Sequence, residues 1–172
     1  MESLQKGVAC TAIALTLSLA ACSSGDPPSG ASATGLNATA DAEAVHSTIT
    51  CQFDPTVEAY APNMAQWGAS GVLQFVLQSA DPAPPALGFN SWTVDVLDAS
   101  GGIQDATFVE IKPWMPYHGH GASTVPQVSR NADGTYLVSE LDFFMVGVWQ
   151  VTFSVQTPAG NDSAVFTFCV GE

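Results

Sequence analysis

The sequence predicts an all-β fold, a β-sandwich of seven or eight antiparallel strands. Apolar and polar residues alternate with a period of two, most clearly where Trp149, Val151, Phe153 and Val155 alternate with Gln, Thr and Ser. Turn sequences rich in Gly, Asn and Asp separate such runs, at 100–102, 131–134 and 158–161. Each strand therefore has one core face and one solvent face, which is typical of a sandwich.

The remaining strands are expected where the same alternation recurs. These segments lie around Leu73 to Leu77 and Trp92 to Val96, at 105–112, 124–130 and 135–141, and around Cys169. No segment favours a long helix, although Val57 to Trp67 is compatible with one short helix over an open end of the sandwich. A chain of 172 residues, 47% of them apolar, can bury one core, so we expect a single domain at 48–172.

The N-terminal residues 1–21 are typical of a signal peptide. The run from Val8 to Ala21 is apolar but too short to span a bilayer, and it ends in Leu19-Ala20-Ala21-Cys22. This tetrapeptide resembles a bacterial lipobox, in which Cys22 becomes the lipidated first residue of the mature protein. The alternative is plain secretory cleavage that leaves a free cysteine. The lipobox predicts a protein anchored by lipid in the bacterial cell envelope, and Ser23 favours the outer membrane, facing the periplasm or the exterior.

Residues 22–47, here called the tether, are rich in Ser, Gly, Ala, Thr and Asn. Such a composition cannot bury enough apolar area to offset the entropy of the chain, so we expect a flexible linker. A coil of roughly 25 residues would hold the domain on the order of 28 Å from its anchor. His46 is expected to be a solvated residue of this linker.

Two cysteines remain for the folded domain, Cys51 near its start and Cys169 near its end. In an exported domain such a pair most often forms a disulfide, which would join the first strand to the last. The chain-entropy model gives a stabilisation of at most about 4.7 kcal/mol for a loop of this size. The alternative, two thiolates that bind a metal, is less favoured because the residues around Cys169 are typical of an ordinary core strand.

Composition and charge exclude several classes of function. Sixteen acidic and three basic residues give a net charge of -13, which is incompatible with binding nucleic acid. The acidity raises the local concentration of cations or simply keeps the domain soluble. Ser123 closely follows His120, but such local neighbours rarely form a catalytic triad, whose members converge from distant segments. No glycine loop opens a helix that could hold phosphate. We therefore expect no enzymatic activity.

Potential metal ligands gather in one segment, from Pro113 to Gly121. It contains Met115, His118 and His120, and Met145 lies some 25 residues further on at the start of a strand-like segment. Glycine and proline interrupt the segment, so it forms a loop rather than a helix. We expect Gly119 and Gly121 to leave room for the two imidazole rings to converge. Thioethers with imidazoles suit copper, especially Cu(I), better than zinc.

Two interpretations of this segment remain open. In the first, the four residues bind copper and the protein is a carrier or buffer. In the second, Met115 and Met145 fill the core, the histidines are solvated turn residues, and the domain is a structural module that binds another envelope protein. The side chains that would anchor such a partner are Trp114, Tyr117 and Trp67.

Three motifs resemble the YtkA-like domain family of bacterial exported proteins and lipoproteins, which is related to the FixH group. They are Met115-Pro116-Tyr117-His118-Gly119-His120-Gly121, Ala132-Asp133-Gly134-Thr135-Tyr136 and Phe144-Met145-Val146-Gly147-Val148-Trp149, within about Asn90 to Val155. The resemblance implies an immunoglobulin-like sandwich on the outer side of a membrane, with a link to copper handling and oxidase maturation. Carried over to this chain, the link falls on Met115, His118, His120 and Met145, whereas Tyr136 and Trp149 serve packing. The acidic N-terminal extension and the two flanking cysteines depart from the family pattern.

Overall fold

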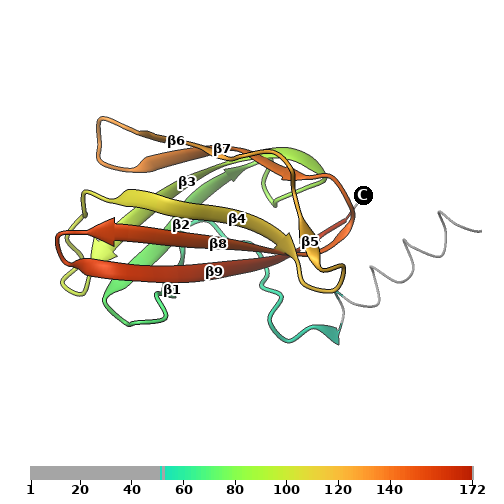
Figure 1. Ribbon diagram of the computed structural model, residues 1–172, viewed down its shortest axis with the longest axis horizontal. Coiled ribbons are helices and arrows are strands. Elements are labelled where there is room, and N and C mark those ends of the chain that lie inside the picture. The colour runs from blue at the N-terminus through green and yellow to red at the C-terminus, as the bar shows by residue number, and fades with distance from the viewer. Residues whose placement is uncertain (1–50, 52, 172) are drawn as a thin grey trace, which may run out of the picture. The chain divides into compact units, whose positions relative to one another are not determined.

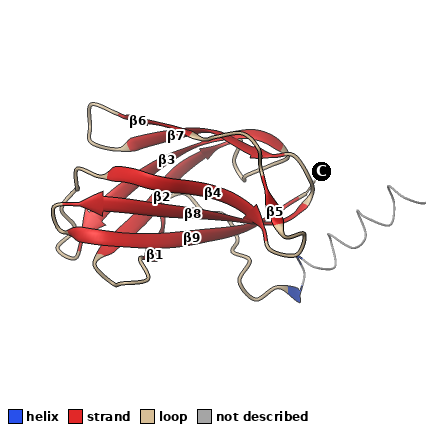
Figure 2. Cartoon of the chain, viewed as in Figure 1, coloured by secondary structure: helices blue, strands red, loops and turns tan. Residues whose placement is uncertain are grey.

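The computed structural model describes Cys51 and residues 53–171, and this part of the chain is all-β, as predicted (Figures 1 and 2). Nine strands are present where seven or eight were expected. Their bounds are β1 Met64–Trp67, β2 Leu73–Asp81, β3 Gly88–Asp98, β4 Thr107–Met115, β5 His120–Gly121, β6 Gln127–Arg130, β7 Tyr136–Phe143, β8 Gly147–Thr157 and β9 Gly160–Val170.

The strands form two antiparallel sheets. One has the order β1-β2-β3-β7-β6 and the other the order β5-β4-β8-β9. Within them, β2-β3-β7-β6 and β4-β8-β9 correspond to the two sheets of a constant-type immunoglobulin domain. The immunoglobulin-like sandwich is therefore confirmed. The additional strands, β1 and β5, are four and two residues long, too short for an alternating pattern to be recognised in the sequence.

The short helix considered for Val57 to Trp67 is wrong. Met64 to Trp67 form β1, which pairs antiparallel with β2 in the register Met64 with Leu77 and Trp67 with Gln74. The free edge of β2 offers unpaired backbone groups, and a strand can satisfy them where a helix cannot. Among the described residues, helical backbone is confined to Cys51 and Phe53 (Figure 2).

The core between the sheets is organised around the fully buried side chain of Trp92 in β3. Four phenylalanine rings surround it with centroid distances between 5.5 and 6.4 Å, all in edge-on arrangements: Phe143, Phe153, Phe166 and Phe168. Edge-on contacts of this kind add to the stabilisation from burial alone. The rings come from β7, β8 and β9, so the Trp92 side chain binds both sheets together.

Antiparallel pairing gathers the loops at two ends of the sandwich (Figure 1). The histidine end consists of the loops 82–87, 116–119 and 144–146 and of the chain after Val170. The far end consists of 68–72, 99–106, 131–135 and 158–159. Both names are used below in this sense.

The predicted disulfide joins Cys51 to Cys169, with 5.5 Å between the Cα atoms. It differs from the expectation in one respect, because Cys51 precedes β1. The bond therefore joins the chain between Cys51 and β1, here called the entry segment, to β9 instead of joining the first strand to the last. The amide of Glu58 also donates to the carbonyl of Thr167 at 2.9 Å. The entry segment is thus held along β9, and the chain enters the sandwich at the histidine end.

A buried carboxylate fastens the far end. Asp162 of β9 is 6% exposed and accepts hydrogen bonds from the amides of Ser70 and Val72 at 2.8 Å and of Leu73 at 3.0 Å. A side chain at Gly68 would collide with this carboxylate. Burial raises the pKa of Asp162, but the surrounding amide donors outweigh it and hold the pKa below its usual value. The loop 68–72, which joins β1 and β2 of one sheet, is thereby tied to the other sheet.

Replacing this carboxylate should destabilise the fold in a pH-dependent manner. Because the folded-state pKa is lowered, the ionised form contributes stability above the unfolded pKa of about 3.9, and that stability is lost as pH falls through the folded pKa. We expect Asp162→Asn to lower the free energy of unfolding at pH 7 by about 1.5–3 kcal/mol, with a smaller difference at acidic pH. Urea denaturation at both pH values measures this.

The matched control is Asp105→Asn, since the Asp105 side chain is 77% exposed and forms a surface ion pair with Arg130. That change should alter the free energy of unfolding by less than about 1 kcal/mol. A difference between wild type and Asp162→Asn that stays constant from pH 7 to acidic pH would contradict the role assigned to the charge.

Removal of the disulfide provides a second test of the fold. The double change Cys51→Ser with Cys169→Ser should lower the free energy of unfolding by up to about 4.7 kcal/mol, because the cross-link restricts the unfolded chain. Guanidinium denaturation with and without a reductant measures the effect. The reductant should lower the denaturation midpoint of the wild type and leave that of the double variant unchanged. A wild-type midpoint that stays the same after full reduction would contradict the prediction.

Candidate functional site

The central element of the histidine end is the hairpin formed by β4 and β5. Met115, the last residue of β4, faces His120, the first residue of β5, and Trp114 faces Gly121. In the turn between them, the Met115 carbonyl accepts hydrogen bonds from the amides of Gly119 at 2.9 Å and His118 at 3.2 Å. The segment 113–121 is therefore a strand, a tight turn and a short returning strand.

The two glycines of the segment serve the backbone, which corrects their expected role. Gly119 has a φ of 69°, in the left-handed region that glycine adopts without strain, and a side chain there would meet open space. A side chain at Gly121 would collide with the carbonyl oxygen of Pro113. The glycines thus allow the turn and the close approach of β5 to β4; they do not clear space for the imidazole rings.

The loop between β7 and β8 packs against this hairpin. The ring of Phe144 stacks on the imidazole of His120, with centroids 5.6 Å apart and planes 25° apart. Phe144 also meets the edge of the buried Trp149 ring at 5.5 Å. The Trp149 indole N–H donates to the carbonyl oxygen of Met145 at 2.8 Å. The backbone of Met145 and the ring of His120 are therefore positioned by one aromatic cluster.

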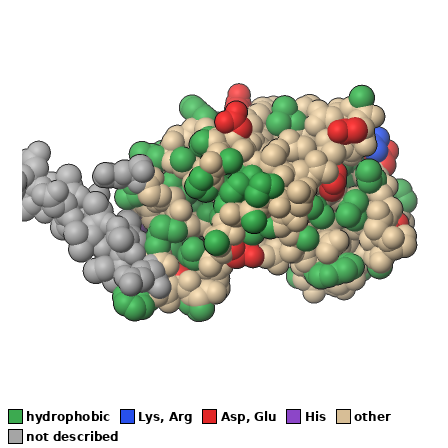
Figure 3. Space-filling view, turned by 180° about the vertical axis from the view of Figure 1, so that it is seen from behind, with side chains coloured by type: hydrophobic (Ala, Val, Ile, Leu, Met, Phe, Trp, Pro, Cys, Tyr) green, Lys and Arg blue, Asp and Glu red, His purple; other side chains and the backbone are tan. Residues whose placement is uncertain are grey.

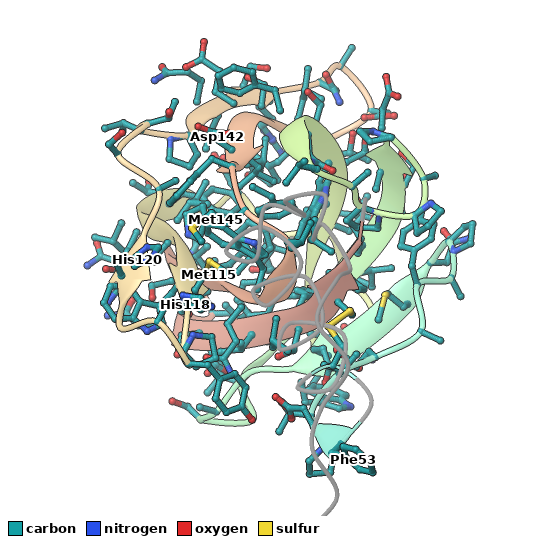
Figure 4. All side chains as sticks on the ribbon, turned by 90° about the vertical axis from the view of Figure 1, so that its right-hand side faces the viewer. Phe53, Met115, His118, His120, Asp142 and Met145 are labelled. Carbon is teal, nitrogen blue, oxygen red and sulfur yellow. A yellow bond between two sulfur atoms is a disulfide. The ribbon has the colours of Figure 1, made fainter. Side chains whose placement is uncertain are left out.

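All four residues predicted as ligands lie at the histidine end (Figure 4). Met115 is fully buried in the core, and Met145 is partly buried against it. His118 is exposed and His120 is half-buried, with their ring centroids 5.6 Å apart. A metal lies about 2 Å from each ligating nitrogen, so rings at this separation can reach the same ion.

The donor set fits a soft metal. Within the part of the chain that the structure describes, no three side chains of His, Cys, Asp or Glu lie close enough together to hold a metal ion. A site at the histidine end therefore depends on imidazoles combined with thioethers, and this combination favours Cu(I) over zinc.

None of the helical residues described is part of a helix long and apolar enough to cross a membrane.

The entry segment also contacts the hairpin turn. The Tyr117 hydroxyl donates to Asp54 Oδ2 at 3.0 Å. The other oxygen of Asp54 accepts from the Thr56 hydroxyl at 2.6 Å and from the Thr56 amide at 2.8 Å, and these two bonds are the main cause of its lowered pKa. Nothing in the sequence indicates this contact, because 63 residues separate Asp54 from Tyr117.

The three proposed interaction anchors occupy different places. Tyr117, 58% exposed, lies at the histidine end, whereas Trp67, 53% exposed, lies at the far end, where β1 ends. Trp114 is half-buried on β4, and the Lys112 ammonium lies 4.5 Å from the centre of its ring. The three residues therefore do not form one surface.

Comparison with known proteins identifies a matching family and several similar solved structures, two of which are given below. A model of the YtkA-like family matches residues 69–154. A copper-bound variant of FetP from uropathogenic Escherichia coli is 12% identical, with a TM-score of 0.42, over 69% of this chain and 97% of that one. The "as isolated" FetP, expressed in the periplasm of Escherichia coli, is also 12% identical, with a TM-score of 0.40, over 69% and 95%. Among curated proteins, none matches this chain.

The contact between Asp54 and Tyr117 should restrain the hairpin turn. We expect Asp54→Ala and Tyr117→Phe each to accelerate amide exchange of His118 and Gly119 severalfold, because both changes remove the same hydrogen bond. Hydrogen exchange followed by NMR measures this.

The control is Asp133→Ala, since Asp133 accepts the same pair of bonds from Thr135 but lies at the far end. Exchange at the hairpin that is unchanged in Asp54→Ala, or equally fast in Asp133→Ala, would show that the contact does not restrain the turn.

Proposed function

The chain belongs to the YtkA-like family, whose model matches half of its length, and from this premise we propose that it binds one Cu(I) ion at the histidine end as a carrier or buffer. The observation that carries the proposal is the arrangement of His118, His120 and Met145 beside Met115 at one end of the sandwich. We further propose that the protein is exported and anchored in the cell envelope through Cys22, which lies outside the described residues.

The two histidines and Met145 are the ligands that solvent can reach. His118 is exposed, and His120 and Met145 are half-buried, so an incoming ion meets these three side chains first. Met115 lies beneath them, fully buried and paired with His120 across the β4–β5 ladder. Its thioether is the fourth soft donor, and it is supplied by the core itself.

The surroundings of the ligands favour the singly charged ion. Phe144 covers one side of the His120 ring, and Trp149 lies behind Phe144. An apolar shell limits water access and lowers the local dielectric constant, which disfavours the higher charge of Cu(II). The net charge of -13 raises the concentration of cations near the protein, while the described residues contain no group of three or more His, Cys, Asp or Glu side chains that could hold a metal ion.

We assign no reaction to this site. Among the hydrogen bonds of residues 53–171, none involves the imidazole of His118 or His120, and the neighbours of His120 are aromatic rings. Nucleophilic catalysis requires a hydroxyl or thiol within hydrogen-bonding reach of the base. The proposed role is therefore binding and release of the ion without turnover.

Titration with Cu(I) under reducing conditions, in competition with a chromophoric chelator, tests the proposal. The chain from Cys22 onward should bind one equivalent, and His118→Ala with His120→Ala should abolish that binding, because two of the three accessible ligands are lost. Met145→Leu, which retains the volume but removes the sulfur, should weaken binding at least tenfold, since one soft ligand is lost.

Two controls separate the site from the fold and from the other histidine. His46→Ala changes the histidine of the tether and should leave binding intact. Circular dichroism and thermal denaturation of the double variant should match the wild type, because His118 is exposed and His120 is half-buried. Unchanged Cu(I) affinity in the double histidine variant would reject the site.

A further inference from the structure

The histidine end carries a group of exposed apolar side chains. They are Phe53 at 75% exposure, Phe89 at 66%, Tyr117 at 58%, Leu87 at 46% and Phe144 at 45%. They come from the entry segment and from the three loops or strand ends that meet there, so residues far apart in the sequence are exposed at the same end of the sandwich. Exposed apolar residues gathered in this way mark an interaction surface.

The described chain begins at this same end. In the immunoglobulin arrangement the first strand corresponds to β2, whose first residue, Leu73, lies at the far end. The residues from Cys51 to Trp67 reverse that polarity, since β1 runs antiparallel to β2 and the disulfide holds Cys51 against β9 near its end. An anchor upstream of Cys51 would therefore be connected to the domain at the histidine end.

The charge of this end restricts what it can contact. Of the two cations among the described residues, Arg130 is paired with Asp105 at the far end and Lys112 lies over Trp114 on β4, so neither lies on the loops of the histidine end. Its carboxylates include Asp54 and Asp142, which accept hydrogen bonds from the hydroxyls of Tyr117 and Thr124. Figure 3 shows that acidic side chains are scattered over another face among large apolar and neutral areas. An apolar surface without cations fits a zwitterionic lipid headgroup layer better than an anionic one.

We propose that the histidine end rests on the zwitterionic surface of the bilayer that holds the lipid anchor, with Phe53 and Phe89 at the contact. This inference rests on the proposed anchoring through Cys22. Phenylalanine side chains of membrane-surface segments are buried at the boundary between headgroups and acyl chains, and tyrosine is enriched at the same interface. A flexible linker from Cys22 to Cys51, roughly 30 residues, would confine the domain to within about 30 Å of the bilayer, so a weak affinity of the domain itself is sufficient. The proposed copper site then opens toward the membrane.

The experiment measures the affinity of the domain for lipid without its anchor. The chain from residue 22 to residue 172, carrying Cys22→Ser, is sedimented with vesicles of phosphatidylcholine and phosphatidylethanolamine. It should partition into these vesicles, and adding phosphatidylglycerol should weaken the partition. Phe53→Ser with Phe89→Ser should weaken it about tenfold, because two apolar side chains are lost from the contact.

The matched control is Ile103→Ser with Val109→Ser, side chains of 50% and 60% exposure that lie away from the histidine end; their loss should leave the partition unchanged. No partition of the unanchored chain, or equal loss in both pairs of variants, would overturn the proposal. A dimer seen in sedimentation velocity and disrupted by Phe53→Ser with Phe89→Ser, without partition, would assign the surface to a second copy instead.

Copper binding and lipid contact can fail separately. Cu(I) titration of the Phe53→Ser and Phe89→Ser variant should give the wild-type stoichiometry, since neither residue is a proposed ligand. Partition without copper binding would refute the proposed function and retain the lipid surface. Copper binding without partition would refute the lipid surface and retain the proposed function. Mass spectrometry of the N-terminal peptide determines lipidation of Cys22 independently of both.

Discussion

The pairing of Met115 with His120 across β4 and β5 is the contact on which the histidine end depends. It pairs an imidazole-bearing residue with the fully buried Met115 in adjacent strands, and it turns the chain so that the His118 ring lies 5.6 Å from the His120 ring. The pairing exists because Gly119 adopts a positive φ and because Gly121 allows the backbone of Pro113 to approach. Without it, the segment would be an open loop whose histidines have no fixed relation to the core.

The residues from Cys51 to Trp67 determine at which end the described chain enters the immunoglobulin-like fold. The sandwich alone would begin at β2, at the far end. These residues add β1, return the chain entry to the histidine end and fix it there with the bond between Cys51 and Cys169. The contact of Asp54 with Tyr117 then links the entry segment to the hairpin turn. The entry segment and the bond between Cys51 and Cys169 lie outside the matched residues 69–154, and they act together as one structural addition.

The sequence predicts features that depend on periodicity or on counting. The strands around Trp92 and Trp149 are recognised because each has one buried and one wet face over many residues. The disulfide follows because only two cysteines remain for the folded domain. The stack of Phe144 on His120 and the amide contacts of Asp162 join segments distant in the sequence, and no local pattern encodes such contacts. For the same reason Met115 and Met145 could be named as sulfur donors, but their different burial could not be predicted.

The two ends of the sandwich are held by interactions of different strength, and this difference bears on metal exchange. At the far end a buried carboxylate receives several amide hydrogen bonds, and removing a charged partner from such a cluster is costly. At the histidine end, the turn and the loop 144–146 are held by ring stacking, by the hydrogen bond between Trp149 and Met145, and by a solvent-exposed hydroxyl contact. Segments with few buried contacts open at low free-energy cost. Met115 is fully buried in the core, whereas His118 is exposed and Met145 is half-buried, so in the proposed copper function the exchange of the ion would fall to the outer residues and leave the sandwich intact.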